Sequence, residues 1–168
     1  MVERYRCKGC GYYHVGSAPE HCPVCGAPKT SFVEYEGPGD LSGSKTLENL
    51  KAAFAGESQA NRMYTLFARI AQLEGAHEAR AAFERAGAEE TAHALGHLAY
   101  MSGFGDTAEN LDTAQAGEDY ECRDMYPGFA AIAEEEGYSE IAFYFRAVGR
   151  FEQQHRDEYG KAREALGE

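Results

Sequence analysis

The sequence lacks long apolar runs and is poor in basic residues. No stretch approaches the roughly 18 consecutive apolar residues that cross a bilayer, and the opening Met-Val-Glu-Arg-Tyr lacks the apolar segment of a signal peptide. Sixteen Lys and Arg stand against 28 Asp and Glu, giving a net charge of −12. Nucleic-acid binding needs clustered Lys and Arg to meet the phosphates, so this charge argues against it. We therefore expect a soluble cytoplasmic protein that binds neither nucleic acid nor a membrane.

Cysteine is scarce beyond residue 25, where Cys122 is the fifth and last. The other four form two Cys-x-x-Cys pairs, Cys7 with Cys10 and Cys22 with Cys25. In a cytoplasmic chain this pattern indicates a metal site rather than disulfides. Gly11 and Gly26 follow the pairs, and a positive φ there would turn backbone N–H groups toward the sulfurs. Residues 1–36 are too few to bury a core alone, so we predict a small module closed by one tetrahedral metal.

Two interpretations of this module remain open, because four thiolates suit zinc and iron equally. One is a structural zinc ribbon. The other rests on the segments Cys-Lys-Gly-Cys-Gly-Tyr and Cys-Pro-Val-Cys-Gly, which resemble rubredoxin, the one-iron electron carrier. Aromatic residues flank both segments: Tyr5, Tyr12, Tyr13 and Phe32. His14 and His21 lie nearby, but four cysteines complete a tetrahedron, so we interpret both as surface residues.

The composition of residues 37–44, rich in Gly, Pro and Ser, is that of a linker. Beyond it, apolar residues recur at helical spacing, and Ser44 or Thr46 can cap the first helix. The predicted helices run over about 45–75, 77–101, 111–136 and from 139 nearly to the C-terminus. Pro127 should kink the third helix or start a new turn. The predicted fold class is therefore mainly α, with a four-helix bundle over 45–168 after the metal-knuckle module.

A Glu-x-x-His motif occurs twice, 62 residues apart, as Glu90 to His93 and Glu152 to His155. Residues three apart share a helix face, so each motif points a carboxylate and an imidazole at one spot. The preceding helices repeat as well, since Ala-Gly-Glu ends at both Glu57 and Glu118. The lone Glu precedes its motif by 33 residues in the first half and by 34 in the second. Two related halves would bring all these side chains to one centre.

Charge makes that centre a metal site. Carboxylates gathered in a bundle interior cost several kcal/mol per unpaired charge, and no basic residue occupies the same turns to neutralise them all. Two divalent cations would do so. A Glu from each of two helices and a Glu-x-x-His from each of two others is the arrangement of ferritin-like di-iron and di-manganese proteins. The alternative is a set of surface carboxylates with two ordinary histidines. The predicted ligands are Glu57, Glu90, His93, Glu118, Glu152 and His155.

Glu121 breaks the repeat, because it lies three residues after Glu118 where the first half has Ala60 after Glu57. A fifth carboxylate would give one metal a choice of ligand. A ferric ion prefers the anionic oxygen, whereas a ferrous ion can accept the neutral imidazole of His93. The alternative is a solvated charge at the mouth of the bundle.

Three segments of the helical region resemble rubrerythrin: Phe-Ala-Gly-Glu-Ser-Gln-Ala at 54–60, Met-Tyr-Pro at 125–127 and Glu-Glu-Gly-Tyr-Ser-Glu-Ile-Ala at 135–142. With the rubredoxin-like module, the resemblance covers nearly the whole chain. The domain order differs, because the usual rubrerythrin carries its rubredoxin module after the bundle. Here the module comes first, as in reverse rubrerythrins. Cys122 also departs from the aromatic residue often found beside this carboxylate.

The resemblance implies a cytoplasmic peroxidase that reduces hydrogen peroxide to water at a non-haem di-iron site. Electrons would reach it through the one-iron module from a separate NAD(P)H-dependent reductase. By position, Glu121 would join the six predicted ligands, with Glu90 and Glu152 as bridges and with Glu121 and His93 exchanging on one iron. The four cysteines would hold the single iron, for which zinc could substitute. Since the carrier module of one rubrerythrin subunit serves the bundle of another, the resemblance also implies at least a homodimer.

Four other side chains near the predicted sites call for an interpretation. Tyr64 and Tyr126 could hydrogen-bond the ligand carboxylates, or else pack in the core. His97 follows His93 by four residues, but its counterpart in the second half is Tyr159, so we interpret it as an ordinary histidine. We interpret Cys122 as a small buried filler.

Two other functions compete with peroxide reduction. A ferritin-like ferroxidase would oxidise ferrous iron with oxygen and store many irons per chain. A non-enzymatic zinc-binding interaction module would be colourless and insensitive to reductant.

Overall fold

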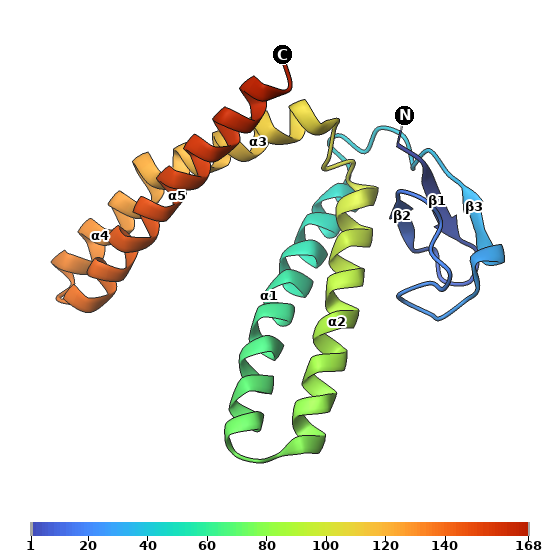
Figure 1. Ribbon diagram of the computed structural model, residues 1–168, viewed down its shortest axis with the longest axis horizontal. Helices are drawn as coiled ribbons and strands as arrows, with labels where there is room; N and C mark the ends of the chain where they lie inside the picture. The colour runs from blue at the N-terminus through green and yellow to red at the C-terminus, as the bar shows by residue number, and fades with distance from the viewer. Residues whose placement is uncertain (1, 168) are drawn as a thin grey trace. The chain divides into compact units, whose positions relative to one another are not determined.

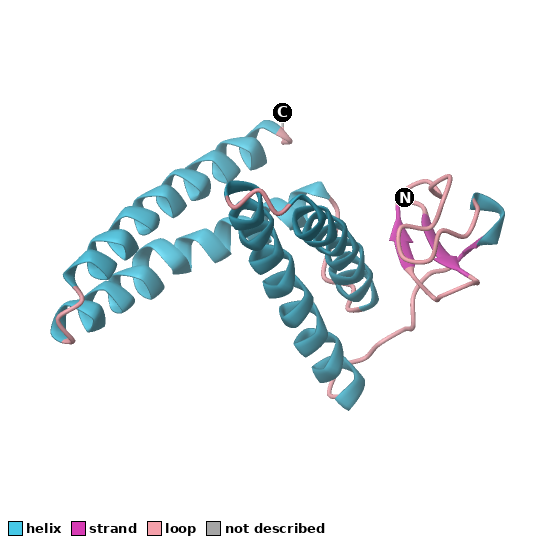
Figure 2. Cartoon of the chain, turned by 90° about the horizontal axis from the view of Figure 1, so that it is seen from below, coloured by secondary structure: helices cyan, strands magenta, loops and turns pink. Residues whose placement is uncertain are grey.

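The computed structural model describes residues 2–167 and confirms the predicted fold class, mainly helical with a small sheet module at the N-terminal side (Figures 1 and 2). The chain forms two compact units, one up to Gly103 and one from Phe104. Within the described residues, no helix is long and apolar enough to cross a membrane.

The N-terminal module is a three-stranded antiparallel sheet of order β2-β1-β3. The strands and the short helix beside them are β1 (Arg4–Cys7), β2 (Tyr13–Val15), η1 (Lys29–Ser31) and β3 (Phe32–Glu34). Cys7 pairs with Phe32 across β1 and β3, and both are buried with Cys22 in the module's small core. The positive φ predicted for the two knuckle glycines is confirmed, at +83° for Gly11 and +71° for Gly26.

The first unit continues into an antiparallel hairpin of α1 (Lys45–Leu73) and α2 (His77–Tyr100) (Figure 1). The predicted cap is confirmed, since the Ser44 hydroxyl accepts a hydrogen bond from the Leu47 N–H at 3.1 Å. Gly75 turns the chain with φ of +74°, a conformation that favours glycine. The buried residues of the two helices are all small: Ala68, Ala71, Gly87, Ala92, Ala94, Gly96 and Ala99. At Gly87 an added β-carbon would lie 3.7 Å from Cβ of Tyr64 on α1, so the absence of a side chain there lets the two backbones approach.

The second unit holds α3 (Thr107–Tyr120), η2 (Glu121–Met125), α4 (Tyr126–Glu135) and α5 (Ser139–Ala165). The predicted start of α3 near residue 111 is wrong by one turn. Asp106 and Glu109 form a capping box in which each side chain accepts the other's backbone N–H at 2.9 Å. The interruption predicted near Pro127 is a π-helical turn, η2, directly before it. Pro127 then lies in the first turn of α4, where its missing N–H costs little.

The sequence repeat is also a packing repeat, seen within each unit separately. Tyr64, Phe67 and Phe83 form a ring cluster with centroids 6.4, 6.1 and 5.5 Å apart. Their counterparts 62 residues later have matching separations of 6.3, 6.1 and 5.7 Å. These counterparts are Tyr126, Phe129 and Phe145. The α1–α2 hairpin is therefore one packing arrangement that occurs again in a second hairpin, formed by the segment α3–η2–α4 and by α5.

Candidate metal centres

The four cysteine sulfurs of the N-terminal module lie within 4.8 Å of one another. Each knuckle is closed in the same way: Gly11 N–H donates to the Cys7 carbonyl at 2.9 Å, and Gly26 N–H donates to the Cys22 carbonyl at 2.8 Å. Cys7 and Cys22 are buried, whereas Cys10 and Cys25 are exposed. One thiol from the end of β1, one from the loop at Cys22 and two from turns thus surround one point, as a tetrahedral metal requires.

The electrostatics of the thiols call for a cation. Burial raises the pKa of Cys10 to about 12, with further contributions from Cys25 and Cys22. Burial also opposes ionisation of Cys7, but backbone hydrogen bonds from Cys10 and Gly9 lead the effects that bring its pKa down to about 7. Four thiols this close ionise together only when a positive ion offsets their mutual repulsion. The site fits a single iron, which four thiolates hold in rubredoxin-like modules.

The first carboxylate cluster lies on the α1–α2 hairpin. Glu57 comes from α1, and Glu90 and His93 come from one face of α2. His93 Nδ1 lies 3.1 Å from a Glu90 oxygen and 3.9 Å from a Glu57 oxygen. The three side chains are partly buried and can offer ligand atoms within 4.8 Å of one another.

The second cluster, within the other unit, repeats this geometry. Glu118 comes from α3, and Glu152 and His155 come from α5. His155 Nδ1 lies 2.8 Å from a Glu152 oxygen and 3.6 Å from a Glu118 oxygen. The structure thus gathers the six predicted ligands into two clusters of three, one in each unit.

Each cluster contains one carboxyl whose pKa is raised by its surroundings. A hydrogen bond shared with Glu90 raises the pKa of Glu57, and the same bond lowers the pKa of Glu90. Burial, followed by Glu152, raises the pKa of Glu118. Glu118 Oε2 is buried and has no hydrogen-bond partner among the described residues. A metal ion would satisfy that oxygen, so these carboxylate and imidazole donors fit iron.

Glu121 lies outside the second cluster but close enough to affect it. Its charge contributes to the raised pKa of Tyr126, after burial, and to the raised pKa of Glu118, after burial and Glu152. Glu121 is the first residue of the π turn η2. A π turn holds one residue more than an α turn, which accounts for the spacing of 34 residues against 33. That one-residue difference was the sequence signal for η2, and the sequence interpretation did not use it.

The remaining predicted side chains have other neighbours. Tyr64 and Tyr126 lie in the two aromatic clusters, and their predicted role toward the carboxylates stays a prediction. Cys122 is half-buried rather than a buried filler. Its thiol donates to the Asp119 carbonyl at 3.4 Å and lies 3.9 Å from the Arg156 guanidinium.

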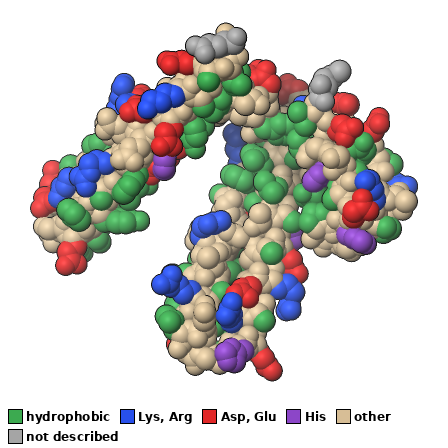
Figure 3. Space-filling model, in the orientation of Figure 1, with side chains coloured by type: hydrophobic (Ala, Val, Ile, Leu, Met, Phe, Trp, Pro, Cys, Tyr) green, Lys and Arg blue, Asp and Glu red, His purple; other side chains and the backbone are tan. Residues whose placement is uncertain are grey.

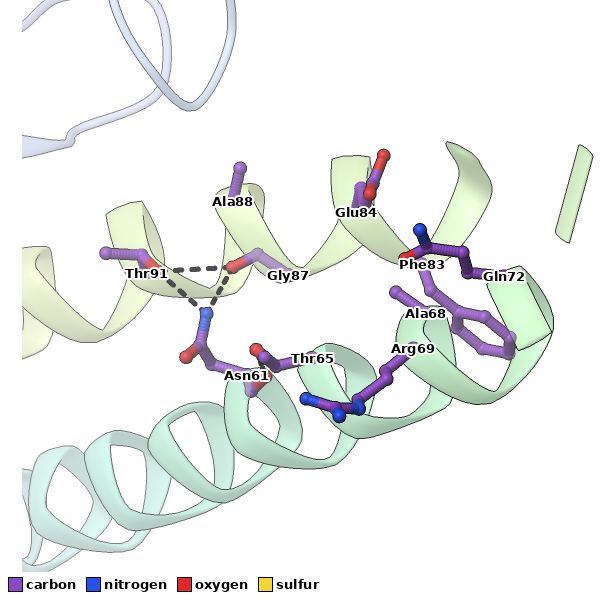
Figure 4. A pocket seen from close by; sticks show the side chains of 10 residues that line it. All are labelled: Asn61, Thr65, Ala68, Arg69, Gln72, Phe83, Glu84, Gly87, Ala88 and Thr91. Carbon is purple, nitrogen blue, oxygen red and sulfur yellow. Dashed lines mark hydrogen bonds between the residues drawn. The ribbon is translucent and has the colours of Figure 1, made fainter. Parts of the chain in front are cut away.

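Sequence reasoning missed a polar clasp between the helices of the first hairpin. The Asn61 amide donates to the Gly87 carbonyl at 2.6 Å and to the Thr91 hydroxyl at 2.9 Å (Figure 4). These residues line a shallow groove of about 440 Å³ together with Arg69 and Glu84. Asn61 is an isolated amide in an otherwise regular helical pattern, so its partner could not be read from the sequence.

The cysteine module contacts α2 of its own chain. The Tyr100 hydroxyl donates a hydrogen bond to the Gly11 carbonyl. The Tyr12 ring packs on Gly96, where an added β-carbon would lie 3.1 Å from Cδ2 of the ring. A cavity of about 230 Å³ lies at this contact, lined by Cys10, Gly11, Tyr12, Val24, His93, Gly96, His97 and Tyr100. Burial lowers the pKa of His97. His97 thus lies on the same cavity as a cysteine of one site and a histidine of another, a position its spacing from His93 did not indicate.

Known proteins match both parts of the chain. Residues 48–163 match the family Rubrerythrin, and residues 5–33 match the family "Rubrerythrin, rubredoxin-like domain". Rubrerythrin of Porphyromonas gingivalis is 41% identical over 132 residues, which cover 71% of this chain and 66% of the relative. Reverse rubrerythrin-1 of Clostridium acetobutylicum is 41% identical over 106 residues, covering 55% of this chain and 59% of that protein. A solved structure titled "Partially Reduced State of Nigerythrin" is 32% identical, covers 79% of this chain and 71% of its own, and has a TM-score of 0.37.

The chain spans slightly less than two thirds of the Porphyromonas relative. The family match nevertheless covers more than half of this chain, and its domains occur in the predicted order. The protein therefore belongs to the rubrerythrin family, with its rubredoxin-like domain preceding the helical domain.

Proposed function

We propose that this protein is a non-haem di-iron peroxidase that reduces hydrogen peroxide to water with electrons relayed through its rubredoxin-like iron site. The observation that carries the proposal is the contact between a four-cysteine site and the helix bearing one of two matching carboxylate clusters. An iron store has no use for an attached one-electron carrier. A catalyst that must be reduced again after each turnover has.

The two clusters together form the dinuclear centre in this proposal. Each cluster alone offers three protein ligands. The unit that carries each cluster also has exposed apolar side chains. The first hairpin exposes Met63 (41%) and Ile70 (42%), and the second exposes Tyr144 (64%) and Phe151 (58%). Figure 3 shows hydrophobic side chains at the surface of both hairpins. Packing one such face on the other would cover these side chains and place four carboxylates and two imidazoles around two cations. Glu121 is the proposed seventh ligand.

The reaction needs two electrons and two protons to convert one hydrogen peroxide into two water molecules, as the O–O bond breaks. Bound iron supplies the two electrons. The carboxylates keep the pair of cations charge-balanced. Burial, then the charges of Glu121 and Glu152, raise the pKa of Tyr126, so its hydroxyl keeps its proton at neutral pH. Tyr126 can then donate a hydrogen bond to an oxygen atom at the centre, and Tyr64 holds the equivalent position in the first hairpin.

Electrons reach the dinuclear centre through the contact between the module and α2 in the same chain. Cys10 of the single-iron site, His93 of the first cluster and His97 line one cavity. The Tyr12–Gly96 and Tyr100–Gly11 contacts fix this approach. The donor to the module is a separate NAD(P)H-dependent reductase, and the protein acts in the cytoplasm as a homo-oligomer.

The test is an anaerobic titration of the reduced protein with hydrogen peroxide. We expect three irons per chain, one peroxide consumed for each reoxidised iron pair, and a slower reaction with oxygen. Glu90→Gln should lose the response, because it removes a ligand. Glu89→Gln is the matched control, since the neighbouring Glu89 is exposed and lies outside the cluster. Many irons per chain with oxygen as the preferred oxidant would instead identify an iron store, and zinc in all sites would identify a binding module.

The electron route has its own test, the substitution of Gly96 by leucine. A side chain at this position meets the Tyr12 ring and should push the module from α2. We expect unchanged iron content and at least about tenfold slower reduction of the dinuclear centre by the single iron, measured by stopped-flow absorbance. Gly128→Leu is the control, because Gly128 faces open space on a helix. Equal rates in the two variants would exclude this route.

A further inference from the structure

We infer that Arg156 is a positioning residue for the second carboxylate cluster, because through Asp119 it fixes the junction of α3 and η2 against α5. This inference rests on the proposed dinuclear centre and adds a side chain outside the set of candidate ligands. The junction carries two of those ligands, Glu118 near the end of α3 and Glu121 at the start of η2. Its placement on α5 therefore decides where the two carboxylates meet a metal ion.

The guanidinium of Arg156 binds carboxylates on two helices. Its Nη1 atom lies 3.3 Å from Asp119 on α3, while Nε and Nη2 donate to Asp157 on α5 at 3.0 and 2.7 Å. The Cys122 sulfur lies 3.9 Å from the same Nη1 atom. The Arg156 side chain is only 18% exposed. A planar guanidinium that uses all three of its nitrogens is fixed in orientation, so it can hold one helix in register with the other.

Asp119 receives a second guanidinium from η2 itself. Arg123 lies 3.0 Å from the same carboxylate that Arg156 contacts. Asp119 directly follows Glu118 and precedes Glu121 by two residues. Because η2 is a π turn, the regular α-helical hydrogen-bond pattern does not continue through this junction. Two ion pairs on one carboxylate constrain the chain at the point where the helix changes its geometry.

Glu118 shows why the placement of the backbone matters. Its Oε2 atom is buried and has no hydrogen-bond partner in the part of the chain that the structure describes. The Nδ1 atom of His155 lies 3.6 Å away, beyond hydrogen-bond distance. With no hydrogen bond to hold this oxygen, its location depends on how α3 sits on α5. Arg156 acts on that contact between the helices rather than on the oxygen itself.

The same two helices carry another ion pair, seven residues away on each, between Arg163 and Asp112 at 2.9 Å. Between the two ion pairs Gly160 packs on Gln115, since an added β-carbon would lie 2.7 Å from Nε2 of that side chain. The two ion pairs therefore belong to one continuous contact between α3 and α5. Seven residues are about two turns, or about 10 Å of helix, so this second pair is a natural control that lies away from the ligands.

The first hairpin lacks this ion pair where its ligands lie. Ser58 and Ala94 occupy the positions equivalent to Asp119 and Arg156, and neither side chain carries a charge. The first hairpin also has a regular α1 and no counterpart of Glu121. The ion pair thus occurs in the hairpin whose helix is interrupted beside its ligands, which supports a role in placing them.

The test compares Arg156→Gln with Arg163→Gln in the full-length protein with its cysteine site loaded. Ferrous iron is titrated anaerobically, and near-infrared circular dichroism follows the ligand-field bands of the carboxylate-bound ions. We expect Arg156→Gln to weaken the binding of one of the two ions by about tenfold and to shift its bands, because groups that orient metal ligands change affinity by about this factor. Arg163→Gln should change neither. Wild-type affinity and bands in Arg156→Gln, or equal changes in both variants, would overturn the inference.

Asp119→Asn, which is nearly isosteric, provides the same test if Arg156→Gln does not fold. It should weaken the same ion and shift the same bands, and wild-type behaviour of this variant would also overturn the inference. When both single variants fold, the double variant should lose no more affinity than either, because the two residues act as one pair. Additive losses would show that Arg156 does not act through Asp119.

These titrations contain no peroxide, so they separate the inference from the proposed function. A wild-type protein that holds its iron pair but does not consume peroxide would remove the function, and the titrations would still decide the role of Arg156. A wild-type protein that consumes peroxide, with Arg156→Gln unchanged in affinity and bands, would remove the inference alone. Failure of the wild-type protein to bind an iron pair would remove both.

Discussion

The two hairpins carry the same three ligands on the same framework, yet they differ by one residue. In both, a histidine Nδ1 lies about 3 Å from the Glu of its own motif and 3.6 to 3.9 Å from the lone Glu. The first hairpin has a regular α1 and the second has the π turn η2 after the lone Glu. The aromatic packing beyond η2 stays in register. A single inserted residue has thus altered the surroundings of one cluster without disturbing the fold around it, a common way for π turns to arise at functional sites.

Each hairpin also secures its helices differently near the ligands. The first uses the neutral Asn61 clasp to Gly87 and Thr91. In the second, Arg156 on α5 reaches Asp119 beside Glu118, at 3.3 Å. Arg156 also pairs with Asp157, at 2.7 Å, and it balances acidic charge that the first hairpin lacks, because Ser58 follows Glu57 where Asp119 follows Glu118. The two halves therefore match in the geometry of their candidate ligands but differ in the charged side chains around them.

The largest expected effect comes from removing one candidate ligand from each hairpin in turn, which tests whether both hairpins contribute to the centre. We expect Glu90→Gln and Glu152→Gln each to lower peroxide turnover by at least about 100-fold, because metal ligands matter no less than the groups that orient them. Iron content and turnover should fall together in both variants. A variant that keeps its iron pair and its rate would show that its half does not contribute to the centre.

The second test converts the second hairpin into a copy of the first. Deleting the exposed Arg123 should turn η2 into α-helix while the residues on either side keep their faces. We expect unchanged iron content and thermal stability at or above the wild-type value, with turnover lower by roughly 10- to 100-fold through loss of the placement of Glu121. Circular dichroism melting and peroxide assays measure the two quantities. Unchanged turnover would mean that η2 has no chemical role.

The third test concerns the repeated aromatic cluster. Phe83→Ala and Phe145→Ala should each destabilise the protein by about 2–4 kcal/mol, less than for a fully buried ring because both are half-buried. Chemical denaturation measures the change. Leu73→Ala is the control, since Leu73 is 80% exposed and should change stability by no more than about 0.5 kcal/mol. If the two substitutions lowered the free energy of unfolding by unequal amounts, the repeated packing would not contribute equally to stability in the two hairpins.

The fourth test uses two equivalent glycines. A β-carbon at Gly87 would lie 3.7 Å from Cβ of Tyr64, an ordinary contact, whereas one at Gly149 would lie 3.2 Å from Cβ of Tyr126. We expect Gly87→Ala to stabilise the protein by about 0.5–1 kcal/mol through helix propensity. Gly149→Ala should gain less or lose stability. Equal gains by denaturant melting would show that the second hairpin relaxes as easily as the first.

The smallest effect comes from an exposed ion pair that the second hairpin has and the first hairpin lacks at the equivalent positions. Hydrogen bonds from Arg146 and Ser139 lower the pKa of Glu134, whereas the equivalent positions in the first hairpin hold Gln72 and Glu84. A lowered folded-state pKa stabilises the protein above the unfolded pKa, and this contribution disappears as pH falls through the folded pKa. Arg146→Gln should therefore lower the melting temperature slightly at pH 7 and not below pH 3. An equal decrease at both pH values would exclude the ion pair as its cause.

Much of this organisation could be predicted from local patterns. Two Cys-x-x-Cys pairs define their own turns, and Glu-x-x-His fixes its own geometry on a helix, so Cys7 to Cys25 and both motifs form the clusters their spacing indicates. The cap at Ser44 was equally local. These features depend on residues a few positions apart, whose relation the backbone determines.

Other features depended on competition or on distant partners. The start of α3 was missed because the Asp106–Glu109 capping box outweighs the weak apolar pattern of its first turn. The π turn was visible only as an unexplained difference in spacing. The cavity beside His97 is also lined by Cys10, and Asn61 bonds the Gly87 carbonyl. Both neighbours lie far along the chain, so no periodicity in one helix reveals them.

The exposed thiols of the cysteine module face different surroundings. Cys10 borders the cavity at α2, while Cys25 is exposed and does not line it. A single iron between them would receive electrons from the Cys25 side and pass them on from the Cys10 side. An external electron donor that binds over Cys25 could reduce the module while the module stays in contact with α2. The module would then not need to dissociate from α2 between accepting and passing on an electron.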